Sequence, residues 1–150
     1  MDKSHPNAGI AIERICLLEC HVSNVKPDVA PNFNLGLTSI RRELSSDAKM
    51  MFFTVGFDLM SRVENPVCRL TCGFGATYSR SLDANMSWDE FSDAIALAQL
   101  IPYVRELVTN LTTRLPLPVL VLPPLNSHQL IREYNELTLA QHAAKVPASV

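Results

Sequence analysis

Residues 101–126 have the sequence IPYVRELVTNLTTRLPLPVLVLPPLN, in which a helical pattern is followed by an extended one. Pro102 suits the first turn of a helix, because its missing N–H would have no partner there. The apolar residues that follow fall on a single helical stripe: Val104, Leu107, Val108, Leu111 and Leu115. Pro116 and Pro118 end the helix and keep the chain extended as far as Pro124. No catalytic set lies in this stretch, so it predicts apolar surface held in a fixed place and favours binding over chemistry.

Before this stretch, the chain carries four segments with the two-residue period of β-strands. They are residues 9–22, 33–38, 53–59 and 67–80. The fourth segment has the longest apolar row on one side: Cys68, Leu70, Cys72, Phe74, Ala76 and Tyr78. Turn sequences at residues 45–47 and 64–66 separate the later segments. Because short turns join consecutive strands, we expect them to pair antiparallel in a four-stranded β-meander.

Helical signals begin at Ser87, which forms a capping-box pattern with Glu90 and predicts a short helix as far as residue 99. A second helix is expected from Pro102, and a third from Asn126, which can cap it. The third helix carries an apolar set of Leu130, Ile131, Tyr134 and Leu137. A sheet followed by helices predicts an α+β fold with the C-terminal helices packed on one side.

Composition limits the classes of protein to consider. The chain has 150 residues, 47% of them hydrophobic, so one domain over residues 9–142 is expected, with flexible tails over 1–8 and 143–150. The net charge of −2 offers no basic face for nucleic acid. No apolar run approaches the roughly 20 residues of a membrane helix, and the polar N-terminus lacks the apolar core of a signal peptide. We therefore expect a cytoplasmic protein.

The four cysteines form two Cys-x3-Cys pairs, Cys16/Cys20 and Cys68/Cys72. Both pairs fall in predicted strands, where four residues span roughly 13 Å. Zinc needs its sulfur ligands about 2.3 Å from one point, so neither pair chelates a metal alone. A site assembled across strands is the alternative, but we expect ordinary half-buried thiols without disulfides.

Other candidates for chemistry also have structural interpretations. The four histidines have no metal-ligand spacing: His5, His21, His128 and His142. Gly73 and Gly75 lack the third glycine of a dinucleotide site, and we expect them to mark a strand kink or a close backbone approach. Asp89, Glu90 and Asp93 resemble a carboxylate cluster, but a helix N-terminus favours acids in any case. We expect no enzyme, no cofactor and no metal.

Apolar surface in excess is the positive signal. Bulky residues near the ends of the third and fourth strands occupy both faces: Met50, Met51, Phe52, Met60 and Val67. A single sheet with helices on one side buries only one face within a monomer, so the other is expected to meet a partner or a client. The alternative is that these residues belong to the core or to an interface between identical subunits.

A resemblance to a known family rests on the opening stretch. Residues 101–106, followed by a set of spaced residues, resemble without a gap the corresponding run of SecB, the bacterial protein-export chaperone. The spaced residues are Thr109, Arg114, Pro118, Leu120, Leu122, Pro124, Asn126 and Leu130. The resemblance implies a four-stranded antiparallel sheet with two helices, assembled as a dimer of dimers. It also implies long apolar grooves between sheet, loop and helix that hold unfolded clients without ATP.

The same resemblance assigns roles to individual residues. It implies a client groove lined by Phe33, Leu35 and Leu37, with Thr77 in the neighbouring strand. At the tetramer interface, it implies that a polar helix face meets its counterpart through Tyr103, Thr109, Asn110 and Thr113. Extended client segments would bury side chains in the groove and pair their main chain with a free strand edge. Several such weak contacts would hold one long chain.

The family offers carboxylates on its sheet to the motor protein SecA. The matching positions here are Glu19, Ser23 and Thr71, which leaves Glu19 as the one acidic candidate for docking SecA. SecB-like proteins also include chaperones that hold the antitoxin of a toxin–antitoxin system. We expect an ATP-independent holdase for preproteins or for one antitoxin; the alternative is a non-catalytic oligomeric adaptor.

Overall fold

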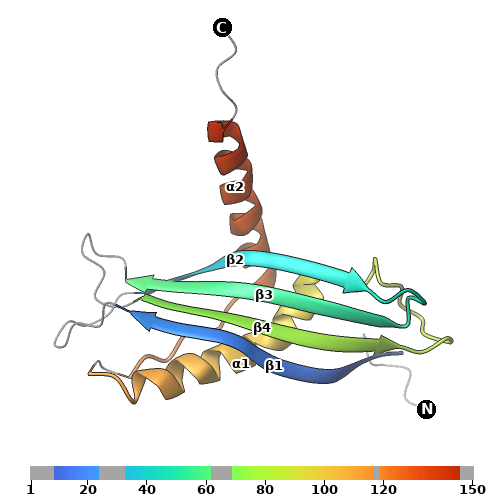
Figure 1. The fold of residues 1–150 in the computed structure, drawn as a ribbon, viewed down its shortest axis with the longest axis horizontal. Coiled ribbons are helices and arrows are strands. Elements are labelled where there is room, and N and C mark those ends of the chain that lie inside the picture. Colours follow the sequence, from blue (N-terminus) through green and yellow to red (C-terminus); the bar gives the residue numbers. More distant parts are fainter. Residues whose placement is uncertain (1–8, 24–32, 62–68, 117–118, 146–150) are drawn as a thin grey trace, which may run out of the picture.

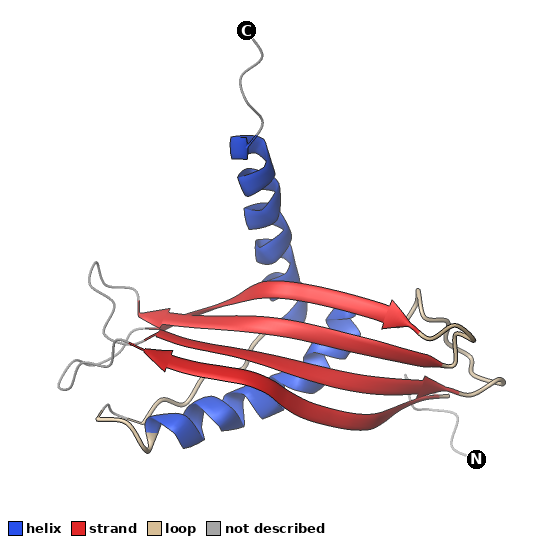
Figure 2. Cartoon of the chain, viewed as in Figure 1, coloured by secondary structure: helices blue, strands red, loops and turns tan. Residues whose placement is uncertain are grey.

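The computed structural model describes residues 9–23, 33–61, 69–116 and 119–145. These residues form four strands followed by two helices (Figures 1 and 2). The elements are β1 (Ile10–Ser23), β2 (Phe33–Leu44), β3 (Met50–Ser61), β4 (Arg69–Arg80), α1 (Asp93–Thr112) and α2 (Ser127–Lys145). The predicted α+β class and the four-stranded antiparallel sheet are confirmed. Both predicted tails, except residues 143–145 at the end of α2, lie outside the described residues.

The sheet has the strand order β1-β4-β3-β2, and every neighbouring pair is antiparallel. Consecutive pairing holds for β2, β3 and β4, but the prediction that β1 pairs with β2 is wrong. The reason lies in β4, where residues 72–76 are buried on both faces of the sheet. An edge strand could not be covered in this way, so β4 needs a second neighbour. β1 fills that place and lies at one edge, with β2 at the other.

The hydrophobic core lies on the side of the sheet that faces α1, which we call the helix-facing side. Five cross-strand pairs of β3 and β4 stack there: Met51–Tyr78, Phe53–Ala76, Val55–Phe74, Phe57–Cys72 and Leu59–Leu70. All ten side chains are buried, and each of the larger ones contributes about 1.5–3 kcal/mol to stability by leaving water. The opposite side of the sheet, which we call the open side, carries neither of the two described helices (Figure 1).

Helix α1 is continuous from Asp93 to Thr112, so the predictions of a helix start at Ser87 and of a boundary at Pro102 are wrong. The capping box does form, since the Ser87 N–H donates to Glu90 Oε2 at 2.8 Å and the Glu90 N–H donates to Ser87 Oγ at 3.2 Å. It closes a turn, however, and Ser92 is the N-cap of α1. The helix runs through Pro102 because its buried stripe does: Leu97, Leu100, Ile101, Val104 and Val108. Packing of that stripe offsets the one hydrogen bond that proline cannot donate.

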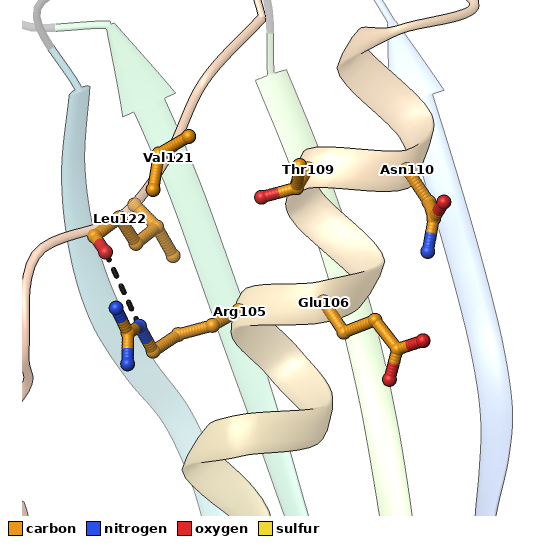
Figure 3. A pocket seen from close by; sticks show the side chains of 6 residues that line it. All are labelled: Arg105, Glu106, Thr109, Asn110, Val121 and Leu122. Atoms are coloured by element: carbon orange, nitrogen blue, oxygen red, sulfur yellow. Dashed lines mark hydrogen bonds between the residues drawn. The ribbon is translucent and has the colours of Figure 1, made fainter.

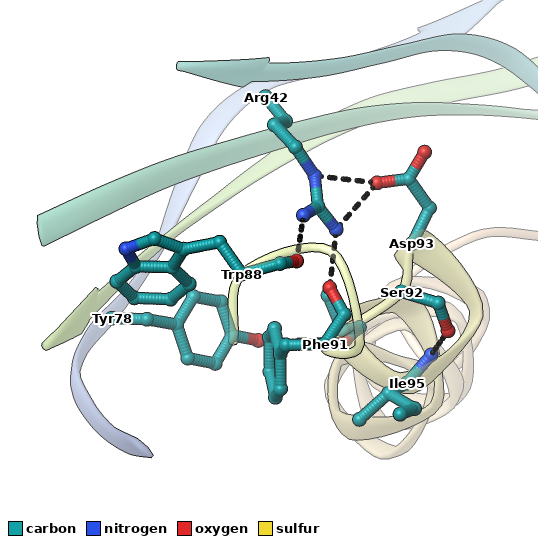
Figure 4. A network of polar contacts seen from close by, with 8 residues as sticks. Arg42, Tyr78, Trp88, Phe91, Ser92, Asp93 and Ile95 are labelled. Carbon is teal, nitrogen blue, oxygen red and sulfur yellow. Dashed lines mark hydrogen bonds and ion pairs between the residues drawn. The ribbon is translucent and has the colours of Figure 1, made fainter. Parts of the chain in front are cut away.

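Arg42 joins the end of β2 to the start of α1 (Figure 4). Its guanidinium donates to Asp93 Oδ1 at 2.9 Å, to the Trp88 carbonyl at 2.7 Å and to the Phe91 carbonyl at 2.6 Å. Trp88 in turn donates its indole N–H to the Ala48 carbonyl at 2.6 Å, and the Phe91 ring lies 4.9 Å from that of Tyr78. These contacts fix α1 against the sheet. Asp93 thus has a structural partner in Arg42, and Glu90 has one in Ser87.

Helix α2 begins as predicted, because the Asn126 side-chain oxygen accepts the Gln129 N–H at 3.1 Å. Its first turns pack on the core through Leu130, Ile131 and Tyr134. The helix then projects away from the β2 edge instead of lying across the sheet (Figure 1). Leu137, expected to share the apolar set, is 60% exposed. Neither α1 nor α2 is long and apolar enough to cross a membrane.

Candidate functional site

Three polar side chains of α1 hold the extended segment that follows it. Thr112 Oγ1 accepts the Leu120 N–H at 2.9 Å, and Thr109 Oγ1 donates to the Leu120 carbonyl at 3.1 Å. Arg105 Nε donates to the Leu122 carbonyl at 3.2 Å (Figure 3). Because these residues are four and three positions apart, they lie along one stripe of the helix. We call this set the α1 ladder; it satisfies main-chain groups that would otherwise be paired in a sheet.

The α1 ladder changes the interpretation of the residues assigned to a tetramer interface. Thr109 is half-buried and its hydroxyl is bonded within the chain. Tyr103, Asn110 and Thr113 are exposed, and helical spacing places them together on the stripe opposite the buried one. Their role at an interface stays a prediction.

A small hollow of about 240 Å³ lies between α1 and the extended segment (Figure 3). Its lining combines four polar residues of the helix with two apolar residues of the segment: Arg105, Glu106, Thr109, Asn110, Val121 and Leu122. It contains no pairing of a nucleophile with a base, and its Arg105 is already bonded to main chain.

A second cavity, of about 300 Å³, lies where β2, the extended segment and α2 meet, and we call it the β2–α2 groove. Its apolar lining is Leu35, Leu122, Pro123, Pro124, Leu125 and Leu130. Polar residues complete it: Asn34, Asn126, Gln129 and Glu133. Apolar walls with a few polar groups are typical of a binding cavity.

Two local features of the chain form this groove: a proline-containing extended segment and an edge strand. The two prolines keep the segment extended and lack N–H groups, so this wall needs few hydrogen-bond partners. β2 is an edge strand, and alternate residues along it direct N–H and C=O groups away from β3. The groove thus combines apolar side chains with the outer edge of a strand that, among the described residues, has a neighbouring strand on one side alone.

The residues predicted to line a client groove separate in the structure. Leu35 lines the β2–α2 groove, whereas Leu37 is only 7% exposed and packs in the core behind it. Phe33 pairs in register with Ser61, and its side chain lies outside the described residues. Thr77 pairs with Phe52 and lies on the open side of β4, with β3 between it and β2. The expectation that Thr77 lies in the strand next to the groove strand is therefore wrong, because β4 neighbours β1 and β3 and not β2.

The groove residues Leu122, Leu125 and Leu130 were not predicted to line a site. The proline-flanked apolar run after α1 predicted an apolar surface held in a fixed place. It did not predict which part of the chain that surface would pack against. That part, β2, is some ninety positions earlier in the chain.

The open side of the sheet bears out the interpretation of two glycines. A Cβ on Gly75 would lie 3.2 Å from Leu18 Cδ1, and one on Gly73 would lie 3.1 Å from Glu19 Cγ. Side chains of β1 thus cross directly over the β4 main chain, which is the close approach that was expected. Glu19, the one acidic candidate for SecA docking, is exposed at this place.

Three cysteines, Cys16, Cys20 and Cys72, lie within the described residues, whereas Cys68 lies outside them. Cys16 lies opposite Gly75 on the open side, whereas Cys20 lies opposite Cys72 on the helix-facing side, so Cys16 and Cys20 cannot chelate together. Burial raises the pKa of the Cys72 thiol to about 12, with smaller contributions from Cys20 and Glu19. Burial also raises the pKa of Cys20. These thiols are protonated at neutral pH and are poor nucleophiles. Within the described ranges, no three His, Cys, Asp or Glu side chains are grouped to hold a metal ion.

Comparison with known proteins identifies the fold. No family model and no curated protein matches the sequence. The structure is similar to a SecB-like chaperone of Mycobacterium tuberculosis, solved in complex with a ChAD peptide from the HigA1 antitoxin. The TM-score is 0.64 at 20% sequence identity, over 77% of this chain and 87% of that chain. A protein of unknown function from Streptococcus agalactiae gives a TM-score of 0.44 at 15% identity, over 77% of this chain and 97% of that chain. The sheet, its two helices and the first of these matches show that the chain has the fold of the SecB-like chaperones.

Proposed function

We propose that this protein is an ATP-independent chaperone that holds extended, aggregation-prone polypeptide segments in the β2–α2 groove. The observation that carries the proposal is an apolar groove directly beside the outer edge of β2, which has no second neighbouring strand in the described part of the chain. A client segment in extended conformation would place alternate side chains against Leu35 and Leu125 while its main chain pairs with β2. Nothing in this process requires a chemical step.

The client class follows from the same groove. Its lining includes six apolar residues and one carboxylate, Glu133, so it selects apolar segments and not charged ones. The mycobacterial structure with this fold holds an antitoxin peptide, which supports a dedicated antitoxin as the client over exported preproteins. SecA docking receives less support, because Glu19 is the one acidic residue among the three positions that match the family's docking site. We place the protein in the cytoplasm as a homotetramer.

Suppression of client aggregation tests the proposal. Leu35 and Leu125 are half-buried groove residues at the edge of the core, so the double variant Leu35→Asp plus Leu125→Asp puts charge in the groove while the fully buried core residues stay unchanged. Light scattering of a chemically unfolded client, without nucleotide, should show protection by the native chain and little by the variant. Leu82→Asp is the matched control, because Leu82 is 89% exposed. Circular dichroism should show that all three proteins are folded. Full protection by the folded double variant would contradict the groove assignment.

An oligomeric adaptor without clients is the second candidate, and one observation favours it. Edge strand β1 exposes Ile12, Leu17 and Leu18, which an assembly could cover. An adaptor of this kind should bind little of an apolar-surface dye once assembled and should leave client aggregation unchanged. A holdase should bind dye that a client peptide displaces.

A further inference from the structure

Two cysteines far apart in sequence face each other across the sheet. Cys20 of β1 and Cys72 of β4 are direct partners in the antiparallel register, and both lie on the helix-facing side. Directly opposite residues of antiparallel strands have Cβ atoms about 4.5–5.5 Å apart. A disulfide needs roughly 3.5–4.5 Å between the same atoms, so a small approach of the two strands is sufficient. Both thiols are free in this structure.

Of the two strands, β1 is better able to make the small movement that brings Cys20 closer to Cys72. β1 is an edge strand, and its register with β4 shifts between Ile12 and Arg14 and again between Leu17 and Glu19. Such bulges let a strand bend locally. Cys20 lies directly after the second shift and is only partly buried, whereas Cys72 is almost completely buried. Reagents in solution can therefore reach Cys20 first.

We propose that Cys20 and Cys72 are a redox site, which a low-molecular-weight disulfide such as oxidised glutathione converts to a cross-strand disulfide. In the first step, the Cys20 thiolate attacks one sulfur of the oxidant, forms a mixed disulfide and releases one glutathione thiolate. In the second, the Cys72 thiolate attacks the Cys20 sulfur and releases the second glutathione. Two protein thiols are oxidised and one glutathione disulfide is reduced to two thiols, with the two protons passing to the released glutathione.

The new bond would tie the β1 edge to a central strand and close a chain loop that contains β2 and β3. A loop of that length restricts the unfolded chain, so the oxidised protein should be the more heat-stable form. The burial that keeps both thiols protonated makes the reaction slow at neutral pH, which suits a response to sustained oxidation. This inference does not depend on the proposed chaperone function.

Peptide mapping tests the site directly, because the sequence lets proteases separate all four cysteines. Trypsin cleaves after Arg69, between Cys68 and Cys72, and a glutamate-specific protease cleaves after Glu19, between Cys16 and Cys20. The reduced full chain is incubated with oxidised glutathione under native conditions, its free thiols are alkylated, and the digest is analysed by mass spectrometry. We expect one linked pair, Cys20 with Cys72, and alkylated Cys16 and Cys68. Oxidation should raise Tm by about 5 °C or more, and a reductant should reverse the rise.

Cysteine-to-serine variants provide the controls. Cys20→Ser should abolish both the link and the rise in Tm, whereas Cys16→Ser should keep both. Because Cys72 is buried and its variant could fail to fold, the half-buried Cys20 is the position on which the test depends. A link between any other two cysteines, glutathione adducts alone, or a Cys20–Cys72 link that forms only in urea would each overturn the proposal.

Discussion

Replacing Arg42 with alanine should loosen the attachment of α1 to the sheet. The guanidinium makes three hydrogen bonds across this junction, to the Asp93 carboxylate and to the carbonyls of Trp88 and Phe91. All three acceptors belong to the segment that leads into α1, so one side chain fixes where the helix begins.

The expected loss in the free energy of unfolding follows from the number of hydrogen bonds and from how exposed the side chains of Arg42 and Asp93 are. The side chains of Arg42 and Asp93 are 25% and 42% exposed, so water screens the ion pair and reduces its contribution to about 0.5 kcal/mol. Each bond to a main-chain carbonyl contributes about 1 kcal/mol, and its loss leaves a partly buried acceptor without its donor. We therefore expect Arg42→Ala to lower the free energy of unfolding by about 2–3 kcal/mol. Arg42→Lys keeps the charge but cannot reach all three acceptors, so its loss should be about half as large.

Urea unfolding followed by fluorescence measures this effect at the junction itself. Trp88 is the only tryptophan of the chain, and its main-chain carbonyl accepts from Arg42. Arg41→Ala is the matched control, because Arg41 is exposed and pairs with Thr54 on the open side. The control should change stability by less than about 0.5 kcal/mol. Equal losses for Arg41→Ala and Arg42→Ala would refute the reasoning.

Three further predictions concern stability measured by urea unfolding. Pro102→Ala should raise the free energy of unfolding by about 1–3 kcal/mol, since Pro102 is exposed inside α1 and alanine restores a helix hydrogen bond; a loss would show that proline is needed there. Thr112→Val should cost about 1–2 kcal/mol, because the Leu120 N–H loses its acceptor, whereas Thr113→Val at an exposed position should cost less. Burial raises the pKa of Cys72 from 9.0 to about 12 and that of Tyr78 from 10.0 to about 12. Their stabilising contribution is therefore complete below pH 9 and is lost as the pH rises towards 12, because the unfolded chain releases these protons first. Between pH 9 and 10 the loss due to Cys72 should be about 1 kcal/mol, and Cys72→Ala should remove it; an unchanged slope would contradict the assignment.

Local patterns predicted much of the fold. The alternation along residues 70–78 gave the buried face of β4 correctly, and the Asn126 cap gave the start of α2. Both depend on residues that are neighbours in the sequence, where spacing determines geometry. The strand order could not be predicted from local patterns. β1 pairs with β4, which is far from it in the sequence, and this pairing covers β4 on its second edge.

The same distinction explains the candidate site. Alternation along β2 places Leu35 in the groove, whereas the expectation of Thr77 in the strand next to β2 fails because β3 lies between β4 and β2. The local preference of Pro102 favours a helix boundary, whereas packing of the buried stripe carries α1 through this position. The groove itself joins β2 to the segment after α1, and no short-range pattern specifies that contact.

The α1 ladder has a consequence for how binding specificity could change. Its three side chains bond residues 120–122 through main-chain atoms, so these hydrogen bonds do not depend on which side chains those residues carry. Proline at position 120 is the exception, because the N–H that donates to Thr112 would be lost. The exposed side chain of Val121 can therefore be exchanged without detaching the segment. Because the ladder bonds main-chain atoms, the exposed surface of this segment can vary in sequence while the segment stays attached to α1.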